Sequence, residues 1–281
     1  MTSLDFARHI KHRLFPVRRP EKPDSPRDRE YELWSAADPS LNIELGWSET
    51  CARFASPNEI YRYLHHYFHH RAPSFLREHR NYFRQERRGF GEDAFHAMWW
   101  LLFLEFHPVR CAEIGVYRGQ VISLWTRIAK VLNQPLEALG ISPLSPAGDV
   151  VSGDYLASLD YQDDISRNFA HFGLGSPQLL KALSTDDVAV SALRSQKWDL
   201  IYIDGNHDEP VVTADYELSR ECLRPGGLMI MDDSGLELGY KPPAFSFGGH
   251  PGPSKVARTR AANELELLGV VGHNVVFRKA V

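Results

Sequence analysis

The feature that most constrains the fold is the alternation of short apolar runs with helical segments after residue 95. Strands alternating with helices are typical of a mainly parallel, doubly wound α/β sheet. The sequence therefore predicts this fold class. We expect helices near 94–106, 121–132, 161–172 and 211–223, and strands near 110–115, 136–141, 178–183, 198–203 and 228–231, followed by a helix and the segment 265–278.

Two of these apolar runs stop abruptly at carboxylates. The run 200–203 is followed by Asp204, and the run 228–231 is followed by Asp232 and Asp233. In an open α/β sheet, ligands bind beyond the carboxyl ends of the strands, and adjacent strands lie about 4.8 Å apart. We therefore expect the three carboxylates to converge on one divalent cation, with Mg²⁺ favoured by oxygen ligands.

A glycine turn follows the first predicted strand. A dinucleotide fingerprint needs three glycines, but the matching positions are Glu113, Gly115 and Arg118. The carboxylate of Glu113 would repel a pyrophosphate. It suits a cofactor that has an ammonium group and no phosphate.

Three motifs in order resemble those of class I S-adenosylmethionine-dependent methyltransferases. Glu113-Ile-Gly115-Val-Tyr-Arg-Gly119 is similar to their motif I, and Leu223-Arg-Pro225-Gly226-Gly227 is similar to the turn into their fifth strand. The third motif, Asp204-Gly-Asn-His207 with Asp232-Asp233, resembles the metal-dependent macrocin-type O-methyltransferases and the cephalosporin-hydroxylase-like proteins. The resemblance covers residues 95–281 and implies a Rossmann-like methyltransferase fold.

The resemblance also implies roles for individual residues. Asp204, Asp232 and Asp233 match the metal ligands, although the family often has Glu at the position of Asp232. His207 matches the proposed general base. Two other interpretations stay open: one acid caps a helix while another is solvated, and the histidine is a structural hydrogen-bonding group.

For the cofactor, the resemblance implies contacts with Glu113, Gly115, Tyr117 and Gly119 of motif I. An acid usually binds the ribose after the second strand, but this chain has Ser142, which offers a weaker hydrogen bond. We expect Asp149 to assist it. After the third strand, Asp186 either accepts from the adenine amino group or caps the next helix.

Composition excludes several other classes of protein. The net charge is −4 and the three cysteines have no paired spacing, which argues against nucleic-acid binding, a disulfide framework and a zinc cluster. The longest apolar stretch, 97–106, is too short to span a bilayer and contains Glu105. Since no secretory pattern precedes it, we expect a cytoplasmic protein without stable membrane insertion.

The N-terminal third divides into a basic, Pro-rich arm (1–30) and a helical extension (31–94) before the methyltransferase domain (95–281). Residues 4–15 are compatible with a short amphipathic helix. A capping box at Ser56 predicts a helix that carries two histidine pairs at i,i+4 spacing, His65/His69 and His66/His70. No nearby carboxylate completes a metal site, so a helix beside the catalytic domain is favoured. The extension is also the candidate surface for homo-oligomer formation.

The sequence thus predicts a Mg²⁺-assisted, S-adenosylmethionine-dependent O-methyltransferase acting on a small hydroxylated molecule, a sugar or natural product. The alternatives are a hydroxylase-annotated relative of the same fold and a noncatalytic cofactor- or partner-binding module. Substrate choice is assigned to the N-terminal region and the loop 240–253, whose sequences do not name the acceptor.

Overall fold

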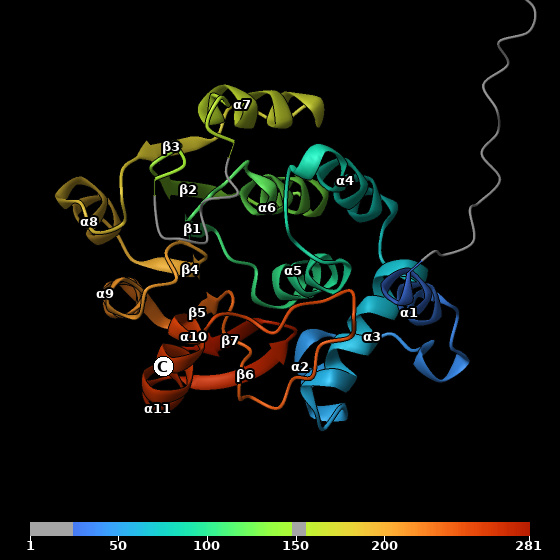
Figure 1. The fold of residues 1–281 in the computed structure, drawn as a ribbon. Coiled ribbons are helices and arrows are strands. Elements are labelled where there is room, and N and C mark those ends of the chain that lie inside the picture. The colour runs from blue at the N-terminus through green and yellow to red at the C-terminus, as the bar shows by residue number, and fades with distance from the viewer. Residues whose placement is uncertain (1–24, 148–155) are drawn as a thin grey trace, which may run out of the picture.

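The computed structural model describes residues 25–147 and 156–281 and contains a seven-stranded sheet of order β3-β2-β1-β4-β5-β7-β6 (Figure 1). The first five strands are parallel, and β7 is antiparallel to β5 and to β6. The predicted fold class is therefore confirmed. The strands are β1 (Arg110–Ile114), β2 (Glu137–Ser142), β3 (Gln178–Lys181), β4 (Trp198–Ile203), β5 (Leu223–Met231), β6 (Glu266–Val271) and β7 (Asn274–Arg278).

Helices cover both faces of the sheet (Figure 1). On one face, α5 and α6 pack against the central strands, and α2 and α3 pack beside them against β6; α8, α9 and α10 cover the opposite face. The helices are α1 (Pro26–Ser35), α2 (Trp47–Arg53), α3 (Pro57–His70), α4 (Ser74–Arg84), α5 (Asp93–Phe106), α6 (Gln120–Leu132), α7 (Tyr161–His171), α8 (Asp187–Arg194), α9 (Glu209–Cys222), α10 (Pro251–Val256) and α11 (Ala262–Glu264).

The extension shares its core with the sheet. Buried aromatic rings connect the two: Tyr61 of α3 packs edge-on against Phe95 of α5, with centroids 6.5 Å apart, and Trp99 of α5 packs edge-on against Tyr202 of β4 at 5.2 Å. The cluster continues through α3 without a break. Because burial of large aromatic side chains contributes much of the stability of a core, α3 and α5 are firmly attached to the sheet.

The N-terminal boundaries differ in one respect from the sequence expectation. The capping box at Ser56 is present, with Glu59 as its reciprocal partner, and α3 follows as predicted. However, α1 begins at Pro26, capped by Ser25, inside the segment assigned to the arm. Proline at the first helical position and a serine cap start a helix as readily as they mark a linker. Residues 4–15 lie outside the described residues, and the three domain boundaries stay predictions.

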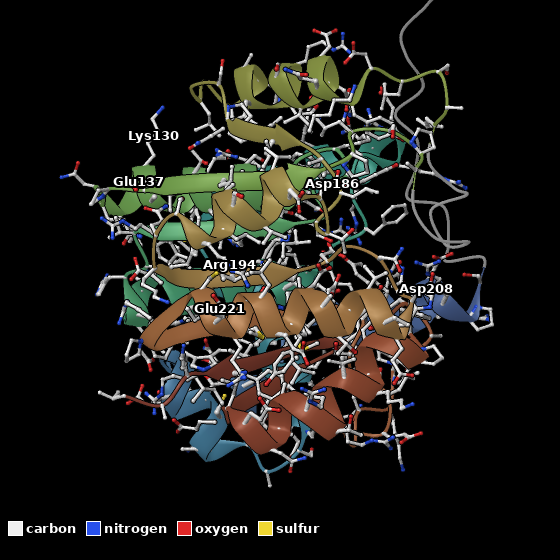
Figure 2. The ribbon with its side chains drawn as sticks, turned by 90° about the vertical axis from the view of Figure 1, so that its left-hand side faces the viewer. Lys130, Glu137, Asp186, Arg194, Asp208 and Glu221 are labelled. Atoms are coloured by element: carbon white, nitrogen blue, oxygen red, sulfur yellow. The ribbon has the colours of Figure 1, made fainter. Side chains whose placement is uncertain are left out.

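The two ends of the strands are well separated. Figure 2 shows Lys130 and Glu137 at the edge where β2 begins, and Asp186 and Asp208 at the opposite edge, where the parallel strands end. Between these edges, Arg194 of α8 and Glu221 of α9 form an ion pair of 2.9 Å across the helical layer. Within the described ranges, we find no helix with the length and apolar character needed to cross a bilayer.

A close backbone contact joins the ends of β1 and β4. Gly115 follows β1 with φ of +91°, and a Cβ atom at this position would lie 1.8 Å from the carbonyl oxygen of Asp204. Neither the contact nor the dihedral angle tolerates a side chain. Gly115 is therefore required by the sheet itself, in addition to any role in cofactor binding.

We expect Gly115→Ala to destabilise the protein by at least about 3 kcal/mol, because the methyl group must push two strands apart. The melting temperature should fall by roughly 10 °C. Thermal unfolding followed by circular dichroism measures this change. Gly175→Ala is the control, since a Cβ atom there meets nothing within 4 Å. Equal melting temperatures for both variants would contradict the assigned contact.

Candidate functional site

Backbone hydrogen bonds extend past the ends of the central strands and hold the predicted acids in place. The amide of Asp204 donates to Ile114 at 2.8 Å, and the amide of Asp232 donates to Ile203 at 2.9 Å. Each acid thus continues the ladder of the strand that precedes it. Side chains on such a rigid edge keep their relative positions, which a catalytic or metal site requires.

A cavity of about 500 Å³ opens at this edge. Its walls contain six of the predicted site residues: Glu113, Tyr117, Asp204, His207, Asp232 and Asp233. Additional wall residues come from the extension and from the loop before α10, among them Phe90, Glu92, Phe95, Phe247 and His250. Apolar walls with a few convergent polar groups are typical of a small-molecule site.

Asp204 and Asp232 are hydrogen-bonded to each other. Burial, together with the charges of Asp232 and Asp233, raises the pKa of Asp204 well above its usual range. Burial also raises the pKa of Asp232. Two adjacent carboxylates cannot both ionise without a compensating cation, so a shared proton or a metal ion is needed here.

Asp233 lies between two histidines. Its Oδ2 is 2.8 Å from Nε2 of His207, and its Oδ1 is 2.8 Å from Nδ1 of His273. A third imidazole, His250, approaches Oδ2 at 3.8 Å. Burial would raise the pKa of the Asp233 carboxyl, but the hydrogen bonds from His207 and His273 outweigh it and lower that pKa.

His273 supplies the positive charge of this cluster. Burial alone would lower the pKa of its imidazole, but Asp232 and Asp233 together raise it to about 10. At neutral pH the ring is therefore an imidazolium beside two carboxylates. Its Nδ1 lies 3.3 Å from Asp232, whose Oδ1 also accepts a 2.6 Å hydrogen bond from Asn274.

Sequence reasoning missed His273, Asn274 and His250. The first two lie in the turn from β6 to β7, and β7 pairs with β5 so that Val275 stands opposite Met231. The available signal was the polar pair between two apolar runs at 265–278. Its significance depends on the antiparallel pairing of β7, which the sequence does not reveal.

The glycine turn is fixed by a buried ion pair. Arg118, which stands where a dinucleotide fingerprint has glycine, forms a bidentate pair with Asp164 of α7 at 2.6 Å and 3.0 Å. Beside it, burial raises the pKa of Glu113 well above normal, and the Oε2 atom of Glu113 has no hydrogen-bond partner in the described part of the chain. Such an atom in a cavity wall indicates a missing donor.

The remaining predicted cofactor residues do not reach this cavity. Ser142 is buried, and its hydroxyl accepts a long 3.4 Å contact from the amide of Leu144. The carboxylate of Asp186 accepts from the amide of Leu183 at 2.8 Å and so closes a turn before α8. Gly115 and Gly119 shape the turn through positive φ angles. Asp149 lies outside the described residues.

Comparison with known proteins identifies the central part of the chain. Residues 112–234 match the sequence model of a family described as a methyltransferase domain. The matched range begins in β1, includes the glycine turn and ends just after Asp233. All three motifs lie within this matched range.

Solved structures share the fold. The putative caffeoyl-CoA O-methyltransferase of Staphylococcus aureus superposes with a TM-score of 0.52 at 13% identity over 78% of this chain and 98% of that one. The S-adenosylhomocysteine-bound methyltransferase PaMTH1 of Podospora anserina gives a TM-score of 0.50 at 15% identity over 75% of this chain and 89% of that one. The chain therefore shares its fold with these two proteins.

The chain also resembles a protein whose name states no activity. The uncharacterized protein R132 of Acanthamoeba polyphaga mimivirus is 26% identical over 125 residues, which are 43% of this chain and 49% of that protein. The chain thus matches about half the length of this relative.

Asp204→Asn should stabilise the protein in EDTA, and more so at higher pH. The raised pKa of Asp204 means that the unfolded chain releases this proton more readily, so wild-type stability falls as pH rises above about 4. Asparagine keeps a donor toward Asp232 without a titrating proton. We expect a gain on the order of 1–3 kcal/mol at pH 8, disappearing near pH 4. Urea unfolding across this pH range measures it.

Asp208→Asn is the matched control, because Asp208 is exposed at the same edge (Figure 2). Its free energy of unfolding should stay within about 0.5 kcal/mol of the wild type at each pH. A pH-independent effect of Asp204→Asn would rule out the shared proton.

Proposed function

We propose that this chain is an S-adenosylmethionine-dependent, divalent-metal-assisted O-methyltransferase acting on a hydroxyl group of a small molecule, a sugar or natural product. The observation that carries the proposal is the shared cavity: motif I, the three carboxylates and His207 all contribute to its walls. A pure cofactor-binding module has no need of a buried acid cluster, which is costly without its cation. A site that activates a hydroxyl group through a metal ion uses such a cluster.

S-adenosylmethionine fits the residues that are present. The unpartnered Oε2 of Glu113 would accept from the ammonium group of the cofactor, and the turn between Gly115 and Gly119 lets the backbone approach it. Tyr117, held in the left-handed region at φ of 44°, directs its ring into the same cavity wall. When bound, the cofactor supplies the electrophilic methyl group.

A divalent cation is proposed for the same edge, where ligand atoms of Asp232, Asp233 and His273 lie within 4.8 Å of one another. Asp204, Asp232 and Asp233 would hold it, and the buried Oδ1 of Asn274, which has no partner within the described ranges, is a further oxygen beside them. Oxygen ligands of this kind favour Mg²⁺. The ion would supply charge that lowers the pKa of an acceptor hydroxyl.

His207 is the proposed general base. Its Nε2 lies 2.8 Å from Asp233, and this hydrogen bond orients the ring and favours the tautomer with the proton on Nε2. Nδ1 would then take the proton of the acceptor hydroxyl, whose oxygen would receive the methyl group that the cofactor supplies. The cofactor would leave as a neutral thioether, and the proton would reside on the imidazole of His207.

Glu113→Gln tests the cofactor assignment. Loss of a charge-assisted hydrogen bond should weaken S-adenosylhomocysteine binding by about 10- to 100-fold in calorimetric titration. Glu137→Gln, at the opposite edge of the sheet, should leave the affinity unchanged (Figure 2). Tight NADH binding without S-adenosylhomocysteine binding would overturn the proposal.

The reaction is tested with labelled S-adenosylmethionine and a panel of hydroxylated acceptors, with methylated products detected by mass spectrometry. EDTA should remove activity and Mg²⁺ should restore it.

His207→Ala should lower the turnover rate by about 10²- to 10⁴-fold while cofactor affinity stays unchanged. His70→Ala, in the exposed end of α3, is the control. Near-normal turnover of His207→Ala would contradict the role of His207 as the general base. Full activity in EDTA would contradict the role of the metal ion.

A further inference from the structure

A second cavity of about 750 Å³ lies between α1, α3, α4 and the start of α5. It shares wall residues with the catalytic cavity, including Arg80, Phe90, Glu92 and Phe245. The two spaces therefore adjoin. A ligand whose hydroxyl group lies at the acid cluster would therefore reach into the second cavity if it is large enough.

Arg80 stands at the junction of the two cavities. It is 9% exposed, and its Nε donates to Oδ1 of Asp93 at 3.1 Å. Its Nη1 atom is buried and has no hydrogen-bond acceptor in the part of the chain that the structure describes. A buried guanidinium donor without an acceptor is costly unless a ligand satisfies it.

Other arginines surround the second cavity. Four arginines line it, against the three carboxylates Asp28, Glu92 and Asp93: they are Arg27, Arg80, Arg84 and Arg87. The carboxylates already have partners: Asp28 accepts from Ser25, and Glu92 accepts from Tyr61 and Ser246. Burial also raises the pKa of Glu92. The walls are thus cationic.

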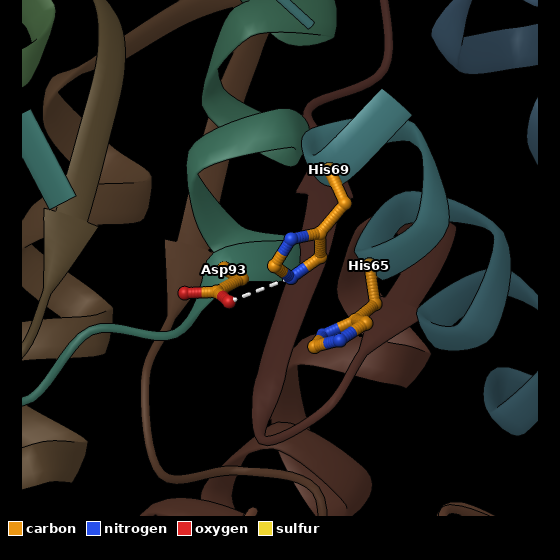
Figure 3. A group of neighbouring side chains, drawn as sticks. All are labelled: His65, His69 and Asp93. Atoms are coloured by element: carbon orange, nitrogen blue, oxygen red, sulfur yellow. Dashed lines mark hydrogen bonds and ion pairs between the residues drawn. The ribbon is translucent and has the colours of Figure 1, made fainter. Parts of the chain in front are cut away.

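The same region contains a histidine cluster that resembles a metal site. The sequence offered no carboxylate for the pair His65/His69, but folding brings in Asp93, whose Oδ2 lies 3.0 Å from Nε2 of His69 (Figure 3). His65 completes the group, and burial lowers its pKa to about 3, so that it is neutral. These residues could ligate a cation in isolation.

The surrounding positive charges disfavour a cation at His65, His69 and Asp93. Asp93 is paired with Arg80, and the guanidinium of Arg84 lies over the ring of Tyr31, whose hydroxyl donates to Asp93 at 2.6 Å. A divalent ion would therefore lie beside two guanidinium groups and one carboxylate. At separations of about 4–6 Å, the repulsion from two cations exceeds the attraction of a single, already paired anion.

We propose that the second cavity, next to its junction with the first, binds an anionic group of the methyl acceptor, a phosphate or a carboxylate, through Arg80, Arg84 and Arg87. This inference rests on the proposed function for the identity of the ligand as the acceptor. Arg80 provides the buried donor, and its forked geometry suits planar or tetrahedral oxyanions. The acceptor is then an acidic hydroxylated molecule, oriented with its hydroxyl toward Asp204 and its anion toward the extension.

Calorimetric titration of the full chain with inorganic phosphate, at constant ionic strength, tests the site. Wild type should bind phosphate saturably at one site. Arg80→Lys, which keeps a charge facing Asp93 but removes Nη1, should weaken binding at least 10-fold. Arg84→Gln and Arg87→Gln should each weaken phosphate binding several-fold. Both positions are exposed, and neither substitution breaks the buried pair between Arg80 and Asp93.

Arg62→Gln is the matched control, because Arg62 is an exposed arginine of the same extension that pairs with Asp38 outside both cavities. Its phosphate affinity should stay within 2-fold of the wild type. A parallel titration with benzoate distinguishes a carboxylate site from a phosphate site. The proposal is overturned if neither anion binds saturably, or if Arg62→Gln loses as much affinity as Arg84→Gln.

S-adenosylhomocysteine binding, measured on the same variants, separates this inference from the proposed function. It should be unchanged in all three cavity variants. If it is weakened together with phosphate binding, the arginines serve the cofactor and the acceptor role is wrong. If no form of the protein binds S-adenosylhomocysteine but phosphate binding follows the arginines, the anion site stands and the methyltransferase proposal fails.

Discussion

The contact between Gly115 and the backbone of Asp204 is the constraint on which the rest of the site depends. It brings the ends of β1 and β4 so close that only hydrogen fits between them. The turn that follows β1 is consequently directed over the carboxyl edge of the sheet, and Asp204 is held at the base of the cavity. Because the same glycine belongs to motif I, the fold and the cofactor site share one stereochemical requirement.

Charge balance is the second organising element. The edge concentrates Glu113, Asp204, Asp232 and Asp233, and within the described residues the imidazolium of His273 is the positive charge in direct contact with this group. Hydrogen bonds also connect the acids: Asp204 is hydrogen-bonded to Asp232, and Asp233 accepts from two imidazoles. Such a cluster responds strongly to any added cation, which is the property expected of a metal-assisted site.

The extension is packed into the body of the molecule. Its helices share one core with α5, α6 and the sheet, and its arginines line a space continuous with the catalytic cavity. Arg27 of α1 and Arg80 of α4 also line the first cavity. Under the proposed function, acceptor selection is therefore expected to depend on residues outside the family-matched range 112–234.

The sequence by itself determined the alternation of strands and helices, the placement of the acids after β4 and β5, and the glycine turn after β1. These features are local: apolar periodicity, glycine φ angles and strand-end position can be recognised in a short window. The assignments of Ser142 and Asp186 depend on longer-range geometry, and the structure places neither in the cavity wall.

Only the tertiary structure decided that His273 and Asn274 join the acid cluster, that Asp93 meets His69, and that Arg80 lacks an acceptor for Nη1. Each of these depends on contacts between segments far apart in the chain, because antiparallel pairing of β7 and docking of α3 on α5 set which side chains meet.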